Sequence, residues 1–146
     1  MKIDLQNKTY ITKAVINTYF FENRNIALEK KLFHKITLFL KDFDSGLEYE
    51  ENPVYTQIIL DWYNLKLPNP SELHGLDLSH KNYCNAEGSI YLGYAYNWCD
   101  VEYLRFSKKS ENSFFIDGKI NIEFENEQIA QNEEFIFKTV CVYENN

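Results

Sequence analysis

The sequence has no long apolar run, and its apolar stretches are short, as in Ile58-Ile59-Leu60. A membrane-spanning helix needs about 20 consecutive apolar residues, so no span is expected. The first residues, Met1 to Lys8, contain neither the apolar segment nor the small-residue cleavage site of a secretory signal peptide. These absences predict a cytoplasmic protein that makes no contact with a membrane.

Catalytic and nucleotide-binding motifs are also missing. The chain contains no GxGxxG, GxxxxGK[ST], HExxH or GxSxG pattern. Carboxylates are plentiful, but a general acid–base pair needs one carboxyl group whose pKa is raised by burial. Glu123 and Glu125 are expected on the solvent side of a strand, which does not fit that role. We therefore predict no catalytic residue, no cofactor and no enzymatic activity.

Cysteine and histidine are scarce. The three cysteines form no CxxC pair, and we expect buried free thiols in a reducing compartment. One grouping has metal-ligand residue types, namely His74, His80, Cys84 and Cys99. Its spacings do not match the closely paired ligands of structural zinc sites. The sequence therefore predicts no metal site and no disulfide.

The composition is that of a folded protein. Of the 146 residues, 45% are hydrophobic, 25% are charged and 16% are aromatic, which is enough apolar surface for a globular core. The length fits one domain, residues 1–146, and no repeat or linker divides it. The abundance of aromatic residues favours β-structure.

Alternating patterns predict a mainly β fold, with α+β at the margin. Residues 9–22 are predicted as a strand, although a helix through Ile11, Val15 and Tyr19 is the alternative. Residues 32–41 should pair with it in antiparallel fashion and place one set of side chains on a common face: His34, Ile36, Leu38 and Leu40. Further strands are predicted at residues 89–94, 101–107, 113–124 and 134–143.

The clearest alternation runs from Lys119 to Glu125. It directs one set of side chains inward, namely Ile120, Ile122 and Phe124, and the other toward water, namely Asn121, Glu123 and Glu125. Asp117-Gly118, just before it, is interpreted as a tight turn or a bulge.

One short helix is predicted near residues 53–64. Asn52 resembles an N-cap and Pro53 a first helical residue. Apolar residues follow at helical spacing: Val54, Ile58, Trp62 and Leu65. The predicted architecture is an antiparallel two-layer sheet or sandwich, with this helix covering one edge.

The net charge is −7, which disfavours nucleic acid as a partner. Two segments rich in carboxylates contain no lysine or arginine. The first contains Asp42, Asp44, Glu48, Glu50 and Glu51, and the second contains Glu123, Glu125, Glu127, Glu133 and Glu134. These ten carboxylates are candidates for binding a basic protein partner, and a merely solvated face is the alternative.

A cluster of aromatic residues occupies the middle of the chain: Tyr91, Tyr94, Tyr96, Trp98 and Tyr103. Most such residues fill a core and its rim. The alternative is an exposed platform for a carbohydrate, another small molecule or a protein, with Tyr94, Tyr96 and Trp98 as its candidate surface.

The stretches 87–92, 97–101 and 103–106, with the strand at 120–125, resemble small, acidic bacterial immunity proteins of toxin–immunity systems. No functional residue is carried over from this resemblance. It implies a non-catalytic protein that binds and neutralises a cognate toxin domain, and the acidic segments favour a basic, nuclease-like toxin. The alternative function is a small-molecule or carbohydrate-binding β-sandwich that uses the residues from Tyr91 to Tyr103.

Overall fold

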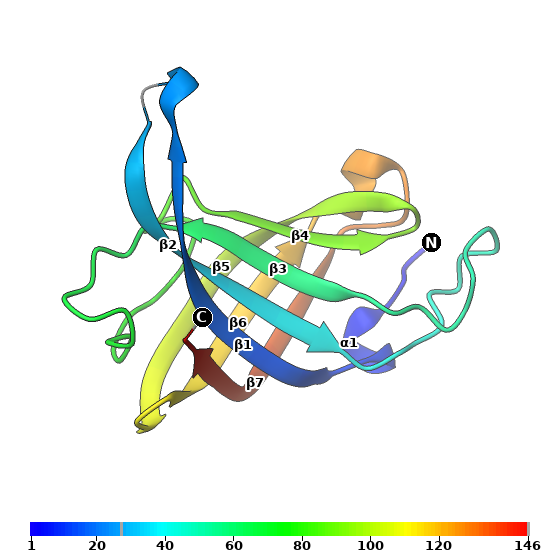
Figure 1. Cartoon of the computed structure of the whole chain (residues 1–146). Helices are drawn as coiled ribbons and strands as arrows, with labels where there is room; N and C mark the ends of the chain where they lie inside the picture. Colours follow the sequence, from blue (N-terminus) through cyan, green and yellow to red (C-terminus); the bar gives the residue numbers. More distant parts are fainter. Residues whose placement is uncertain (27, 146) are drawn as a thin grey trace.

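Seven β-strands form a closed barrel in the computed structural model, which describes residues 1–26 and 28–145 (Figure 1). The strands are β1 (Ile11–Asn23), β2 (Leu28–Leu40), β3 (Gln57–Tyr63), β4 (Glu87–Leu92), β5 (Ala95–Ser110), β6 (Ser113–Ile122) and β7 (Glu133–Glu144). Three short helical segments accompany them: α1 (Leu5–Lys8), η1 (Arg24–Ile26) and η2 (Phe124–Glu127). Within the described residues, no helix has the length and apolarity needed to cross a membrane.

The barrel closes between its first and last strands. Neighbouring strands in the chain pair antiparallel, whereas β1 and β7 pair parallel, with Ala14 opposite Cys141 and Asn17 opposite Glu144. The predicted two-layer sandwich is therefore wrong. Inward and outward residues alternate along a strand in a sandwich and in a barrel alike. Closure depends instead on a contact between the two ends of the chain, which local alternation does not reveal.

The first predicted strand pair is confirmed. Residues 9–22 and 32–41 lie largely within β1 and β2, which pair antiparallel. The four residues predicted to share a face of β2 are all buried: His34, Ile36, Leu38 and Leu40. Apolar residues alternate with other residues in this segment because successive side chains of a strand point to opposite faces.

The predicted helix at residues 53–64 is wrong, because β3 occupies this region. The β3 sequence QIILDWY is rich in β-branched and aromatic residues, which favour strands, and β2 and β4 supply hydrogen-bonding partners on its two sides. Val54 and Ile58 are buried as predicted, but Val54 lies in a loop and Ile58 lies in a strand. Trp62 is only half-buried and has a left-handed backbone conformation with φ 63°. Pro53 follows a cis peptide bond in the loop before β3.

The C-terminal half confirms the predicted β-structure, with two corrections. Ile120, Ile122 and Phe124 are buried. However, β6 ends at Ile122, so Glu123 and Glu125 lie at and within η2 rather than on the outer face of a strand. Gly118 lies inside continuous β6, and a Cβ atom there would overlap the Phe137 ring. This glycine therefore allows close packing rather than a turn.

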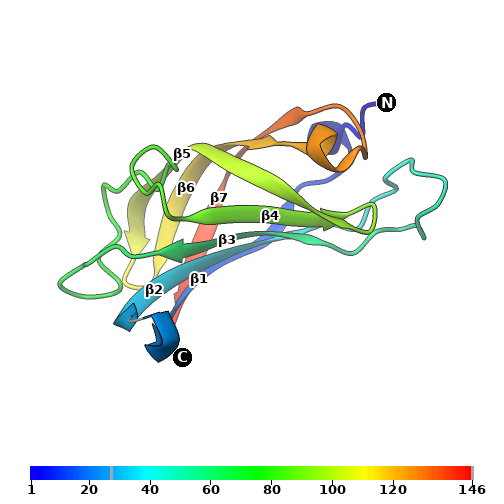
Figure 2. The same ribbon diagram turned by 90° about the horizontal axis from the view of Figure 1, so that it is seen from above.

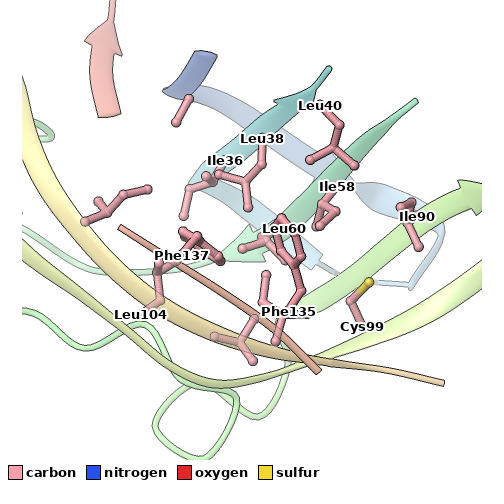
Figure 3. Close-up of a cluster of buried hydrophobic side chains, with 14 of the residues drawn as sticks. Ile36, Leu38, Leu40, Ile58, Leu60, Ile90, Cys99, Leu104, Phe135 and Phe137 are labelled. Atoms are coloured by element: carbon pink, nitrogen blue, oxygen red, sulfur yellow. The ribbon is translucent and has the colours of Figure 1, made fainter. Parts of the chain in front are cut away.

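Apolar side chains from all seven strands meet inside the barrel, and Figure 3 shows ten of the cluster labelled. Ile3 and Leu5 cover one end of the barrel from the N-terminal segment. The long loop between β3 and β4 lies at the opposite end (Figure 2) and buries Leu73 and Leu78. Tyr63 donates a hydrogen bond from its hydroxyl group to the Leu78 carbonyl oxygen at 2.8 Å.

Candidate functional site

Two acidic segments that are distant in the sequence lie at the same end of the barrel. Figures 1 and 2 place the loop of residues 41–56, the helix η2 and the N-terminal segment together at this end, which we call the acidic end. The first acidic segment lies in that loop, and the second includes η2 and the start of β7. The ten predicted carboxylates therefore belong to one region of the molecule.

A tight turn between β4 and β5 joins the two acidic segments. Gly93 and Tyr94 both have left-handed φ angles, 65° and 60°, as in the turns that best connect twisted antiparallel strands. Glu50 accepts a hydrogen bond from the Gly93 backbone N–H at 2.7 Å. A Cβ atom at Gly93 would lie 2.9 Å from Ile129 and 3.0 Å from the Tyr49 hydroxyl group. Glycine is therefore needed for the close approach of these loops.

Part of the predicted carboxylate set maintains the fold. Buried Glu133 accepts hydrogen bonds from the backbone N–H groups of Asp4 at 3.0 Å and Leu5 at 2.6 Å. Glu134 lies 3.3 Å from the Lys119 ammonium group. Other members accept local hydrogen bonds, namely Asp44 from Gly46, Glu123 from Asn126, and Glu125 from Asn132. These carboxylates already have partners within the protein.

Four carboxylates of the set remain available at the acidic end: Asp42, Glu48, Glu51 and Glu127. All four are exposed, and none makes a hydrogen bond or ion pair with the described residues. Tyr49 and Tyr94 lie among them, with ring centroids 6.0 Å apart and more than half of each residue exposed. The acidic end thus combines free negative charge with exposed aromatic rings.

The aromatic residues predicted as an alternative surface are exposed. Tyr96 and Trp98 lie on the outer face of β5 and are 71% and 40% exposed. Tyr91 faces Tyr96 from β4, with ring centroids 4.7 Å apart. Tyr103 is half-buried and lies under the Arg105 guanidinium group. The interpretation of this cluster as core is therefore wrong for four of its five residues, namely Tyr91, Tyr94, Tyr96 and Trp98.

Three further aromatic residues extend this surface and were not predicted as part of it. Phe39 on β2 and Tyr55 before β3 are exposed, and half-buried Trp62 lies at the end of β3. The alternation of residues 32–41 already placed Phe39 on the side opposite the buried face. Tyr55 and Trp62 had no such signal, because the segment was interpreted as a helix.

The residues considered for metal binding are dispersed. His74 accepts a hydrogen bond from the Lys108 N–H, His80 lies 3.1 Å from Asp100, Cys84 is exposed, and Cys99 is buried. Among the described residues, no group of three or more His, Cys, Asp or Glu side chains is placed to hold a metal ion. The expectation of three buried thiols is wrong for Cys84.

The buried thiols are poor nucleophiles. Burial, with a smaller contribution from the charge of Glu123, raises the pKa of the Cys99 thiol far above its usual range. Burial raises the pKa of Cys141 to about 12. Because the thiolate is the reactive form, both thiols are almost fully protonated at neutral pH.

Comparison of the chain with protein-family models, curated proteins and solved structures gives no significant match. The surface of the barrel offers exposed aromatic rings and free carboxylates, which are groups suited to binding.

Proposed function

We propose that the protein is a non-catalytic immunity protein that binds a basic, nuclease-like toxin domain and neutralises it. The observation that carries this proposal is the convergence of both acidic segments at one end of the barrel (Figure 1). A nuclease active site must attract polyanionic nucleic acid and is therefore basic. A concentrated negative surface on its inhibitor complements that charge and accelerates association.

The composition of the acidic end fits a protein interface. Tyrosine is enriched among the residues that dominate binding energy, because its ring buries a large area at a low entropic cost. Tyr49 and Tyr94 supply such rings beside Glu48 and Glu51, which have no partner within the described residues. The tyrosines would then contribute mainly to the lifetime of the complex, and the carboxylates to its rate of formation.

A second candidate function is carbohydrate binding by the exposed rings of Tyr91, Tyr96 and Trp98. These rings can stack on the apolar faces of sugars in the way that aromatic residues line other ligand sites. Binding of a soluble β-glucan oligosaccharide by the purified protein would test this function.

The immunity function predicts that a gene beside this one encodes a secreted protein with a toxic C-terminal domain, and the test uses that domain. Co-expression should rescue the growth of cells that produce this domain, and the purified proteins should bind each other. The charge-reversed variant Glu48→Lys/Glu51→Lys should associate about tenfold or more slowly at low salt, with a smaller difference at high salt.

The matched control is Glu72→Lys/Glu111→Lys, which makes the same change in charge in loops at the other end of the barrel. Its association rate should change much less than that of the first variant. Absence of binding and rescue would refute the immunity function. Equal association rates for the two variants would refute the role of the acidic end.

A further inference from the structure

The outer face of β3, β4 and the start of β5 carries an open groove. It consists of two adjoining depressions of about 530 and 380 Å³, both lined by Ile59, Ser89 and Tyr96. We call this feature the aromatic groove. Asp42 lines the first depression and Glu127 lines the second. Each acidic segment therefore contributes one carboxylate, so the groove is continuous with the acidic end.

Aromatic rings form much of the groove lining. Phe39, Tyr55 and Tyr91 line the first depression, Trp62 and Trp98 line the second, and Tyr96 belongs to both. Between them lie the smaller side chains of Ile59 and Ser89, which point outward from β3 and β4. The small side chains between the rings leave space for a slender ligand that lies against several of the rings.

The charged residues that line the aromatic groove are all acidic. They are Asp42, Asp61, Glu87 and Glu127, and the lining contains no lysine, arginine or histidine. Asp61 and Glu87 lie directly opposite each other in the register of β3 and β4. Like charges in this arrangement destabilise a sheet. A cation bound between them would remove that repulsion.

Asp61 is held in place before any ligand arrives. Its Oδ1 atom accepts hydrogen bonds from the Tyr19 hydroxyl group at 2.7 Å and from the Trp62 backbone N–H at 2.6 Å. The second bond accompanies the left-handed conformation of Trp62. The Oδ2 atom has no partner among the described residues. A fixed carboxylate thus lies beside an indole ring at one part of the groove.

We propose that the aromatic groove binds an extended segment of the partner protein that carries arginine or lysine side chains. Aromatic faces attract cations, and guanidinium groups both stack on rings and form paired hydrogen bonds with carboxylates. A neutral sugar would use the rings and donate hydrogen bonds from its hydroxyl groups to the carboxylates, but it would leave their four negative charges uncompensated. The inference deepens the proposed function and rests on it for the identity of the partner. The chemistry of the groove can be tested separately.

The first experiment uses a short fluorescent peptide that alternates arginine and glycine, and the same peptide with citrulline in place of arginine. Citrulline keeps the shape of the side chain and removes its charge. The wild-type protein should bind the arginine peptide about tenfold or more tightly than the citrulline peptide. Equal binding, no binding of the arginine peptide, or preferential binding of a soluble β-glucan oligosaccharide would overturn the proposal.

Substitutions then locate the binding site. Tyr96→Ala and Glu87→Gln should each weaken binding of the arginine peptide about fivefold or more. The controls are Phe115→Ala, which removes an exposed ring from the outer face of β6, and Glu111→Gln, which removes a charge between β5 and β6. Both controls should bind as the wild type does. All four side chains are exposed, so each variant should fold, and circular dichroism would check this. Equal losses in variants and controls would overturn the proposal.

Measurements on the toxin domain separate the two ideas. If both hold, Tyr96→Ala should increase the dissociation rate of that domain, whereas Glu48→Lys/Glu51→Lys should mainly slow association. Peptide binding without toxin binding would support the groove and refute the immunity function. Toxin binding without any preference for the arginine peptide would leave the immunity function in place and refute the groove.

Discussion

The two halves of the barrel wall differ in whether their outward-facing charged side chains are paired with an opposite charge. On the outer face of β5–β7, which we call the paired face, Lys119 lies 3.0 Å from Glu102 and 3.3 Å from Glu134. In the aromatic groove, Asp61 and Glu87 face each other and no cationic residue lines the surface. On the paired face, two carboxylates of the chain surround Lys119, whereas the groove carboxylates have no cationic partner among the described residues.

The inner sides of the same two halves are alike. Gly88 on β4 lies against the Cys99 backbone, and Gly118 on β6 lies against the Phe137 ring. Each glycine allows the wall to pack without a gap. At these two glycines the inner sides are alike, and the difference in charge pairing lies on the outer surface.

The largest expected effect concerns thiol reactivity, which tests how tightly the barrel is closed at β5 and at β7. Exposed Cys84 should react with a maleimide at once at neutral pH, whereas Cys99 on β5 and Cys141 on β7 should react slowly. A pKa raised from 9.0 to about 12 leaves Cys141 about a thousand-fold less thiolate, and burial limits reagent access as well. Mass spectrometry would follow each thiol.

Rapid labelling of Cys99 alone or Cys141 alone would show that the barrel opens locally at β5 or at β7. In denaturant, all three thiols should react. A count of one would contradict the prediction that the chain forms no disulfide.

Alanine substitutions at the two glycines should have the next largest effect, which is a loss of stability. Gly88→Ala and Gly118→Ala should each lower the free energy of unfolding by about 1–3 kcal/mol through overpacking. Gly88→Ala should be the worse, because its Cβ atom would lie 2.5 Å from a backbone oxygen, which moves less readily than a side chain. Denaturant unfolding would measure both, with exposed Ser107→Ala as the control. If either substitution left the stability unchanged, the strands at that position would be able to move apart and accommodate the added methyl group.

Glu87→Lys should have a smaller effect of opposite sign. It turns the like-charge pair with Asp61 into an attractive pair, which should raise the free energy of unfolding by up to about 1 kcal/mol at low salt. Glu111→Lys makes the same change in charge outside the groove. If the two variants were equally stable, the gain would come from the lower net negative charge of the whole molecule and not from the pair of Asp61 and Glu87. The gain should shrink at high salt.

Lys119→Met on the paired face should have the smallest effect. A hydrogen bond from Lys119 is the main cause of the lowered pKa of Glu102. A carboxylate with a lowered pKa stabilises the fold above its ordinary pKa, and this contribution is lost as the pH falls through the lowered value. Lys119→Met should therefore be slightly less stable than the wild type at neutral pH and equal to it in strong acid.

NMR titration of Glu102 should show a higher pKa in Lys119→Met than in the wild type. Lys108→Met, which removes an exposed lysine elsewhere on β5, should leave that pKa unchanged. If Glu102 titrates identically in both variants, the charges of the paired face are not coupled.

Local patterns predicted the strands more successfully than the site. Alternation identified Ile36 and Leu38 as inward residues of a strand, because both strand faces are encoded at a period of two. It failed at residues 53–64, where Val54, Ile58 and Trp62 happen to lie at helical spacing. There the pairing of β3 with strands on both sides outweighed the local signal.

The acidic segments show a similar division. Their charge was visible in the sequence, but nothing local distinguished Glu133 from Glu127. Glu133 is buried and accepts two backbone hydrogen bonds, whereas Glu127 is exposed and lines the aromatic groove. Only packing against the N-terminal segment separates a structural carboxylate from a free one.

The sequence by itself determined the inward and outward faces of most strands, the apolar interior and the excess of negative charge. Tertiary structure decided that the sheet closes through β1 and β7, that two distant acidic segments meet at one end, and that Asp61 faces Glu87 beside a row of aromatic rings. The physical reason is the range of the interactions. Side-chain alternation depends on neighbouring residues, whereas closure and the aromatic groove depend on contacts between segments that only the folded barrel brings together.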